Sequence, residues 1–130
     1  ETESRKVNNT ENVYLLNRYI SNGEMKWLIS HSKSVVLPYI EASQSGVLPI
    51  AYYYGKPVIT SDVPGLSQFV VEGQTGYVCK DRREITKALN CIPDLNAEVF
   101  AVNTKKYYRE HFDWEVNIRN LLFELEGMLA

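Results

Sequence analysis

The sequence predicts a three-layer α/β domain in which about four short parallel strands are flanked by helices. Two observations lead to this prediction. Short runs of consecutive apolar residues, typical of strands that are buried on both faces, recur before residue 80. Segments with helical spacing separate these runs, and strands that alternate with helices along a chain form a parallel sheet. The 130 residues suffice for one domain and leave little room for a second.

The first part of the chain is predicted to contain two strands and one helix. Residues 13–16 are an apolar run, which we expect to be a strand buried on both faces. Ser21 and Glu24 have the spacing of a capping box, so the helix that follows should begin there and end at residue 31 or 32. Residues 35–37 are the second predicted strand, and Pro38 ends it because proline cannot donate to the ladder.

Glycine and proline mark the boundaries of the middle segment. A helix is predicted over residues 47–54, because Gly55 suits the position just past a helix end and Pro57 cannot continue a helix. Residues 58–60 and 77–79 are the third and fourth predicted strands. Between these strands the sequence predicts a turn, a short helical turn and a second turn, at residues 62–65, 66–71 and 72–76.

The last third of the chain is predicted to be helical. Helices are expected from residue 81 to about 93 and from 94 to 110. The clearest helix begins after Asp113, which can cap it, with Trp114 as its anchor. Its apolar stripe should be either part of the core or an interface that truncation of the chain leaves uncovered. The stripe consists of Trp114, Ile118, Leu121, Leu122, Leu125, Met128 and Leu129.

Composition and charge exclude several classes of protein. The formal net charge is −2, which excludes a general nucleic-acid binder because such proteins carry a basic surplus. No apolar run approaches the ~18 residues that cross a bilayer, and no signal peptide is visible. Cys79 and Cys91 have neither CxxC spacing nor a histidine at metal-ligand spacing. We therefore expect no metal site and a reducing, cytoplasmic location. The polar residues 1–10 should be a flexible lead-in to a partial domain.

The loop over residues 41–47 has the clearest features of a binding site. It follows a predicted strand and runs into a predicted helix, and open parallel sheets bind ligands beyond the carboxyl ends of their strands. The first turn of a helix exposes unpaired N–H groups, so Gly46 would let an anion such as phosphate come close, beside the Ser43 and Ser45 hydroxyls. A simpler interpretation stays open, in which one serine only caps the helix, Gly46 serves packing and Glu41 is a solvated carboxylate.

These residues match the pattern of a known family. Residues 35–80 resemble the C-terminal, donor-binding domain of the group 1 glycosyltransferases, which have the two-domain GT-B fold. The resemblance implies a Rossmann-like partial domain that is truncated at its N-terminal side. The motifs occur in the family's order and span nearly the whole chain. They are Leu37-Pro38, Glu41, Gly55-Lys56-Pro57-Val58-Ile59, Ser61-Asp62, Gly65-Leu66, Gly73-Gln74-Thr75-Gly76 and Phe112-Asp113-Trp114-Glu115.

The resemblance implies an activity and a set of residue roles. Enzymes of this family transfer a sugar from a nucleoside-diphosphate donor to an acceptor, usually with retention and without a metal or other cofactor. We expect a glycan or lipid-linked acceptor, in polysaccharide synthesis in the cytoplasm or at the inner face of the membrane. By resemblance, Glu41 is the catalytic candidate and reaches the sugar. Ser43, Gln44, Ser45, Gly46 and Val47 would hold the donor diphosphate and sugar, and Arg18, Tyr19 and Ile20 would border the nucleotide base.

Departures from the family's pattern leave other functions open. Ile50 stands where the family's second glutamate, which usually holds the ribose, would fall. The two strands that open the family's C-terminal domain, with their glycine loop and basic clamp, have no counterpart, and the acceptor-binding domain is missing. We therefore expect this chain alone to be inactive. The alternatives are a non-catalytic module that binds a nucleotide or a protein, and a fragment that self-associates through an open sheet edge.

Overall fold

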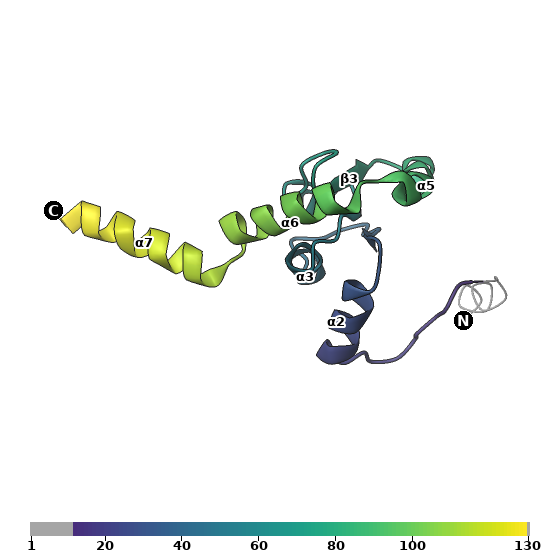
Figure 1. Cartoon of the computed structure of the whole chain (residues 1–130), viewed down its shortest axis with the longest axis horizontal. Helices are drawn as coiled ribbons and strands as arrows, with labels where there is room; N and C mark the ends of the chain where they lie inside the picture. Colours follow the sequence, from purple (N-terminus) through teal and green to yellow (C-terminus); the bar gives the residue numbers. More distant parts are fainter. Residues whose placement is uncertain (1–11, 130) are drawn as a thin grey trace.

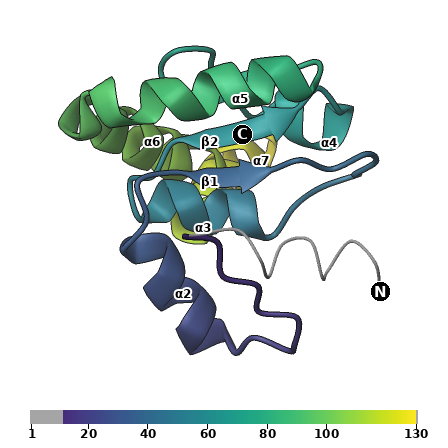
Figure 2. The ribbon, with the colours of Figure 1, turned by 90° about the vertical axis from the view of Figure 1, so that its right-hand side faces the viewer.

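The computed structural model describes residues 12–129 and confirms the predicted α/β class. Three parallel strands, β1 (Val35–Leu37), β2 (Val58–Ser61) and β3 (Gly76–Cys79), form one sheet in the order β1-β2-β3. Helices cover both faces, with α5 on one side of the sheet and α2 and α3 on the other (Figure 2). The prediction that residues 1–10 are a lead-in lies outside the described residues.

The helices follow the predicted order (Figure 1). The Ser21–Glu24 capping box is present at the start of α2, as predicted. The short helix α4 begins two residues before the predicted helical turn, because Pro64 suits the first position of a helix. The helical elements are α2 (Asn22–Ser30), α3 (Val47–Tyr53), α4 (Pro64–Ser67), α5 (Arg82–Cys91), the 3₁₀ turn η1 (Ile92–Asp94), α6 (Ala97–His111) and α7 (Trp114–Leu129).

The core has two parts, one on each face of the sheet. Leu37 and Val58 point to the α3 side, where they meet the buried residues Leu48, Ala51 and Tyr52. The other part lies under α5 and consists of Ile59, Cys79 and Ala88, and burial raises the pKa of the Cys79 thiol. Successive strand residues point to opposite faces, so the continuous apolar run of β2 is buried on both sides, as the sequence predicts.

The predicted strand at residues 13–16 does not form. This segment has no regular secondary structure and is exposed, with Tyr14 at 90%. The sheet ends at β1, and the backbone of residues 13–16 has no neighbouring strand to bond to within residues 12–129. An apolar, β-favouring sequence becomes a strand only when a partner supplies the hydrogen bonds of its ladder. The sheet therefore has three described strands rather than four.

The outer edge of β3 is closed by side chains. Val78 N–H donates to Glu72 Oε2 at 2.9 Å, and Lys80 N–H donates to Glu84 Oε2 at 2.7 Å. A strand at the edge of a sheet otherwise presents free N–H groups to any incoming strand. The two glutamates therefore occupy the donors that a further strand would need.

The outer edge of β1 is open. Val35 N–H donates to Pro57 O at 3.0 Å, on the side of β2. Because successive residues of a strand alternate, the N–H and C=O of Val36 point to the outer side. Among residues 12–129, no hydrogen bond is found to either group. Within residues 12–129 the two edges thus differ: the outward N–H groups of Val78 and Lys80 at β3 are bonded to glutamates, whereas the outward N–H of Val36 in β1 has no partner.

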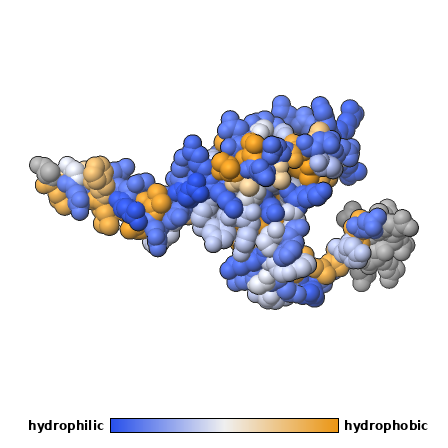
Figure 3. Space-filling view, in the orientation of Figure 1, coloured by the Kyte–Doolittle hydropathy of each residue, from blue (hydrophilic) through white to orange (hydrophobic). Residues whose placement is uncertain are grey.

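The last helix, α7, contributes no buried residue to the core. It extends away from the sheet (Figure 1), and its apolar side chains lie on the surface (Figure 3). Trp114 is 74% exposed, so the prediction that it anchors the helix is wrong. The helix begins where expected, with Asp113 Oδ1 accepting from Glu115 N–H at 3.0 Å. The apolar stripe of α7 was predicted to be either part of the core or an uncovered interface. The exposure of α7 excludes the first interpretation and leaves the second.

Candidate functional site

The loop between β1 and α3 is where the sequence places the anion site. It leaves β1 at its carboxyl end and enters α3 through Ser45 and Gly46. Val47 N–H donates to Ser45 Oγ at 3.2 Å, but the N-cap residue of α3 is Gly46, which makes no side-chain cap hydrogen bond. Neither serine is therefore the N-cap residue of the simpler interpretation: Ser45 lies one residue before the cap and accepts the Val47 N–H, and Ser43 is exposed.

Gly46 is not explained by packing or by backbone conformation. Its φ of −73° and ψ of −19° suit any residue. A Cβ added at this position would meet no atom within 4 Å. The interpretation in which Gly46 serves packing is therefore wrong. The glycine leaves open space directly beside the first N–H groups of α3.

A hollow of about 300 Å³ lies against this loop. The structure brings three of the predicted site residues together in its lining: Gln44, Ser45 and Gly46. Glu41 and Ser43 do not line it and face solvent, and Val47 packs against the core below. The rest of the lining is Leu48 and Pro49 from α3, Gly65 from α4, and the aromatic residues Phe69 and Phe112.

Gly65, Phe69 and Phe112 were not among the predicted site residues. They come from segments 18 residues or more beyond the loop, and only the folded chain places them opposite it. The Gly65-Leu66 pair was visible as a family motif. Phe112 was likewise part of a family motif, at the start of the last helix, whereas Phe69 carried no signal, since aromatic residues are common in any core.

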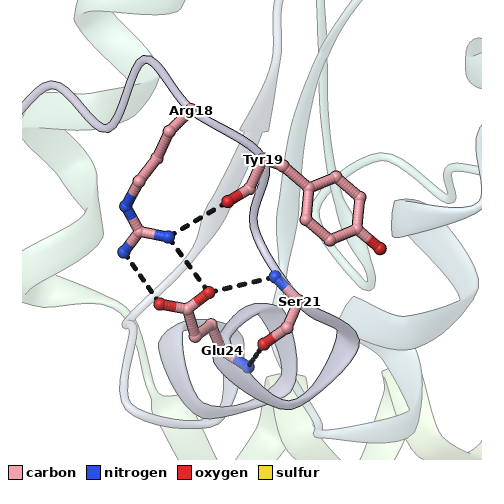
Figure 4. Close-up of polar contacts among 4 residues, drawn as sticks. All are labelled: Arg18, Tyr19, Ser21 and Glu24. Carbon is pink, nitrogen blue, oxygen red and sulfur yellow. Dashed lines mark hydrogen bonds and ion pairs between the residues drawn. The ribbon is translucent and has the colours of Figure 1, made fainter.

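The predicted base-binding segment, residues 18–20, leads into α2 (Figure 4). Arg18 contacts both carboxylate oxygens of Glu24, with Nη2–Oε1 at 2.8 Å and Nη1–Oε2 at 3.2 Å. Arg18 Nη1 also donates to Tyr19 O at 3.0 Å. The Tyr19 side chain is 86% exposed and its ring lies on the far side of the main chain from the guanidinium. None of Arg18, Tyr19 and Ile20 lines the hollow beside the loop.

Glu24 organises this segment. Its Oε2 also accepts the Ser21 N–H at 3.0 Å, while Ser21 Oγ accepts the Glu24 N–H at 3.2 Å. Hydrogen bonds from Arg18, and then from the Ser21 N–H, lower the pKa of Glu24 to about 2. The guanidinium and the capping box thus fix the main chain where it enters α2.

The Glu24 carboxyl should titrate near pH 2, well below the ordinary glutamate value, in a carbon-detected NMR titration. Because its pKa is lower in the folded chain, its contribution to stability is present above the unfolded-state pKa and is lost as the pH falls towards 2. Arg18→Gln removes the largest cause and should raise the pKa of Glu24. An unchanged Glu24 titration in this variant would show that the ion pair does not form.

Within residues 12–129, no helix is both long and apolar enough to cross a membrane. In the same part of the chain, no group of three or more His, Cys, Asp and Glu side chains is placed to hold a metal ion.

The fold and the loop define a class of protein: a parallel α/β domain that presents a loop and a hollow at the carboxyl end of a strand, where such sheets bind ligands. Residues 1–93 match the family model described as Glycosyl transferases group 1. The chain therefore belongs to the group 1 glycosyltransferases, which confirms the resemblance seen in its motifs.

One curated relative shows how much of such a protein is present. The chain is 28% identical over 107 residues to the Alpha-1,3/1,6-mannosyltransferase ALG2 of Dictyostelium discoideum. The aligned part is 78% of this chain and 25% of the relative. The chain thus spans about a quarter of the length of the curated relative that it matches.

Proposed function

We propose that this chain is the donor-binding portion of a glycosyltransferase that takes its sugar from a nucleoside diphosphate. The observation that carries the proposal is Gly46, a glycine that neither conformation nor packing requires, with open space beside the N-terminus of α3. It lines the hollow together with Gln44 and Ser45, inside the part of the chain that matches the family. Phosphate oxygens suit unpaired N–H groups at such a position.

The proposed roles are those that the family resemblance implies, and the positions of Gln44, Ser45 and Gly46 in the hollow support them. The N–H groups of Ser45 and Gly46 hold the diphosphate, and that of Val47 joins them when it leaves Ser45 Oγ. Gln44 lies beside the diphosphate in the lining of the hollow, and Ser43 approaches it from the solvent side. Glu41 is exposed at the start of the loop, where it orients the sugar hydroxyls rather than acting as a nucleophile. The main chain of residues 18–20, fixed by Glu24, borders the base. Transfer is favoured mainly by positioning and by neutralising the departing diphosphate.

The acceptor is a glycan or a lipid-linked glycan, and it is bound by a part of the enzyme that this chain does not contain. We propose transfer with retention, in the synthesis of a polysaccharide, in the cytoplasm or at the inner face of the membrane. The distant likeness to a mannosyltransferase supports sugar transfer in general. The 130 residues alone are expected to bind donor weakly and to transfer nothing.

Two substitutions of Gly46 test the diphosphate site by calorimetry with UDP and GDP. The wild-type chain should bind one of them with a Kd of about 1 mM or tighter. Gly46→Ala fills the open space and should weaken binding roughly tenfold, while stability changes by less than ~0.5 kcal/mol because the φ and ψ suit alanine. Gly46→Pro also removes the N–H and should abolish binding. Equal affinities in all three chains would contradict the proposal.

A second candidate function is a non-catalytic module that associates through its open sheet edge. The outer N–H and C=O of Val36, which have no hydrogen-bond partner among residues 12–129, favour it. Sedimentation equilibrium of the wild-type chain separates the two candidates. A monomer at every concentration contradicts association through β1, whereas a dimer that binds neither UDP nor GDP supports the module over the donor site.

A further inference from the structure

The loop that carries the proposed diphosphate site is held by β2 and α4. Ser61 Oγ, at the end of β2, donates to Tyr39 O at the start of the loop. Gly65, in α4, meets the loop farther along. A Cβ added to Gly65 would lie 2.1 Å from Ala42 O and 2.5 Å from the carbonyl carbon of Ser43. Ordinary contacts between such atoms are 3.5 to 4.0 Å, so only a glycine allows α4 and the loop to approach this closely.

The helix α4 cannot retreat from the loop. Leu66, the residue after Gly65, is fully buried in the core on the α3 side of the sheet. Ser67 N–H and Ser67 Oγ both donate to Val63 O, at 2.9 and 3.0 Å, and hold the single turn closed. Tyr52 OH donates to Phe69 O at 2.8 Å, just beyond the end of α4. A side chain at position 65 would therefore displace the loop and not the helix.

The displaced residues would be those of the proposed site. Ala42 and Ser43 lead directly into Gln44, Ser45 and Gly46, which line the hollow. Gly65 lines the same hollow from the opposite side. The distance between α4 and the loop therefore sets both the shape of the hollow and the direction of the N–H groups that face it.

We infer that Gly65 and Ser61 are positioning residues, which hold residues 42–46 at the distance from α4 that diphosphate binding needs. The inference rests on the proposed function, because the hollow that they shape is the proposed diphosphate site. Gly65 acts by the absence of a side chain and Ser61 by its hydrogen bond to Tyr39 O. A methyl group at position 65 moves the Ala42–Ser43 peptide by about 1 Å, and displacements of this size can reduce the function of a site ~100-fold.

The test compares Gly65→Ala and Ser61→Ala with the control Gly127→Ala, whose added methyl meets no atom within 4 Å. Two-dimensional ¹⁵N–¹H NMR reports on the loop, and calorimetry with UDP and GDP reports on binding. Gly65→Ala should shift the amide signals of residues 42–46 most strongly and weaken nucleotide binding about tenfold or more. Ser61→Ala should shift the same signals less. Gly127→Ala should leave these signals and the affinity unchanged.

The readouts separate positioning from a general structural role. A role in stability alone would lower the melting temperature and leave the affinity of the folded chain unchanged, which would overturn the inference. Unchanged amide signals of the loop in folded Gly65→Ala would also overturn the inference. If Gly65→Ala does not fold, unchanged loop signals in Ser61→Ala would overturn it instead. If the wild-type chain binds neither UDP nor GDP, the proposed function is contradicted. The NMR comparison would still show whether Gly65 and Ser61 set the position of the loop.

Discussion

Gly76→Ala should lower the free energy of unfolding by about 3 kcal/mol or more, which is a large part of the stability of a small domain. Gly76 is the first residue of β3 and pairs with Val58 of the central strand. A Cβ at this position would lie 2.0 Å from Val58 O and 2.9 Å from Val58 C. Both atoms belong to a fully buried main chain that cannot move aside. The methyl group would therefore push β3 away from β2 and break the ladder between them.

Urea unfolding followed by circular dichroism measures this effect. Gly127→Ala is the matched control, because it adds the same methyl group inside α7 where there is space. That control should not destabilise the chain, since alanine favours a helix over glycine by about 1 kcal/mol. A Gly76→Ala chain that unfolds within ~0.5 kcal/mol of wild type would mean that β2 and β3 do not approach as described.

Tyr52→Ala should cost about 4 kcal/mol, because it opens a cavity in the core and removes a buried hydrogen bond. The Tyr52 side chain is fully buried, and its ring packs edge-on against Tyr107 with centroids 5.4 Å apart. Its hydroxyl donates to Phe69 O at 2.8 Å and has Thr75 Oγ1 as a second partner at 2.9 Å. Burial raises the pKa of Tyr52, so the hydroxyl stays protonated at any ordinary pH.

Tyr52→Phe separates the two contributions. It keeps the ring and leaves the partners of the hydroxyl unsatisfied, so it should cost about 1 to 3 kcal/mol. Thr75 Oγ1 would still accept the Val71 N–H at 2.9 Å, and the turn before β3 should therefore keep its shape. Denaturant unfolding of both variants gives the two values. Equal losses for the two substitutions would show that the cavity contributes nothing.

Features that depend on neighbouring residues were predictable from the sequence. Ser21 and Glu24 make their capping box because the two side chains need only the first turn of their own helix. Gly55 has the left-handed φ of 74° expected just past a helix end. The three strands were found because each is a short apolar run between clear turn residues.

Features that depend on distant partners were not predictable in the same way. Residues 13–16 have the sequence of a strand, but strand formation needs a neighbour that the described chain does not place beside them. Trp114 is apolar and helical, and nothing local shows that α7 extends into solvent. The site shows the same limit: Gly46 is recognisable from its own loop, whereas the contact of Gly65 with Ala42 exists only after folding.

The difference between the two sheet edges limits how copies of this chain could assemble. Open-ended fibres need two different complementary surfaces on each copy, so that every addition leaves a new end free. Here Glu72 and Glu84 bind the outward N–H groups at β3, and in the described structure β1 is the edge whose outward N–H stays available to a further strand. Two copies meeting edge to edge at β1 would be related by a two-fold axis and would consume the edge of each. Growth would then stop at a pair with one continuous sheet.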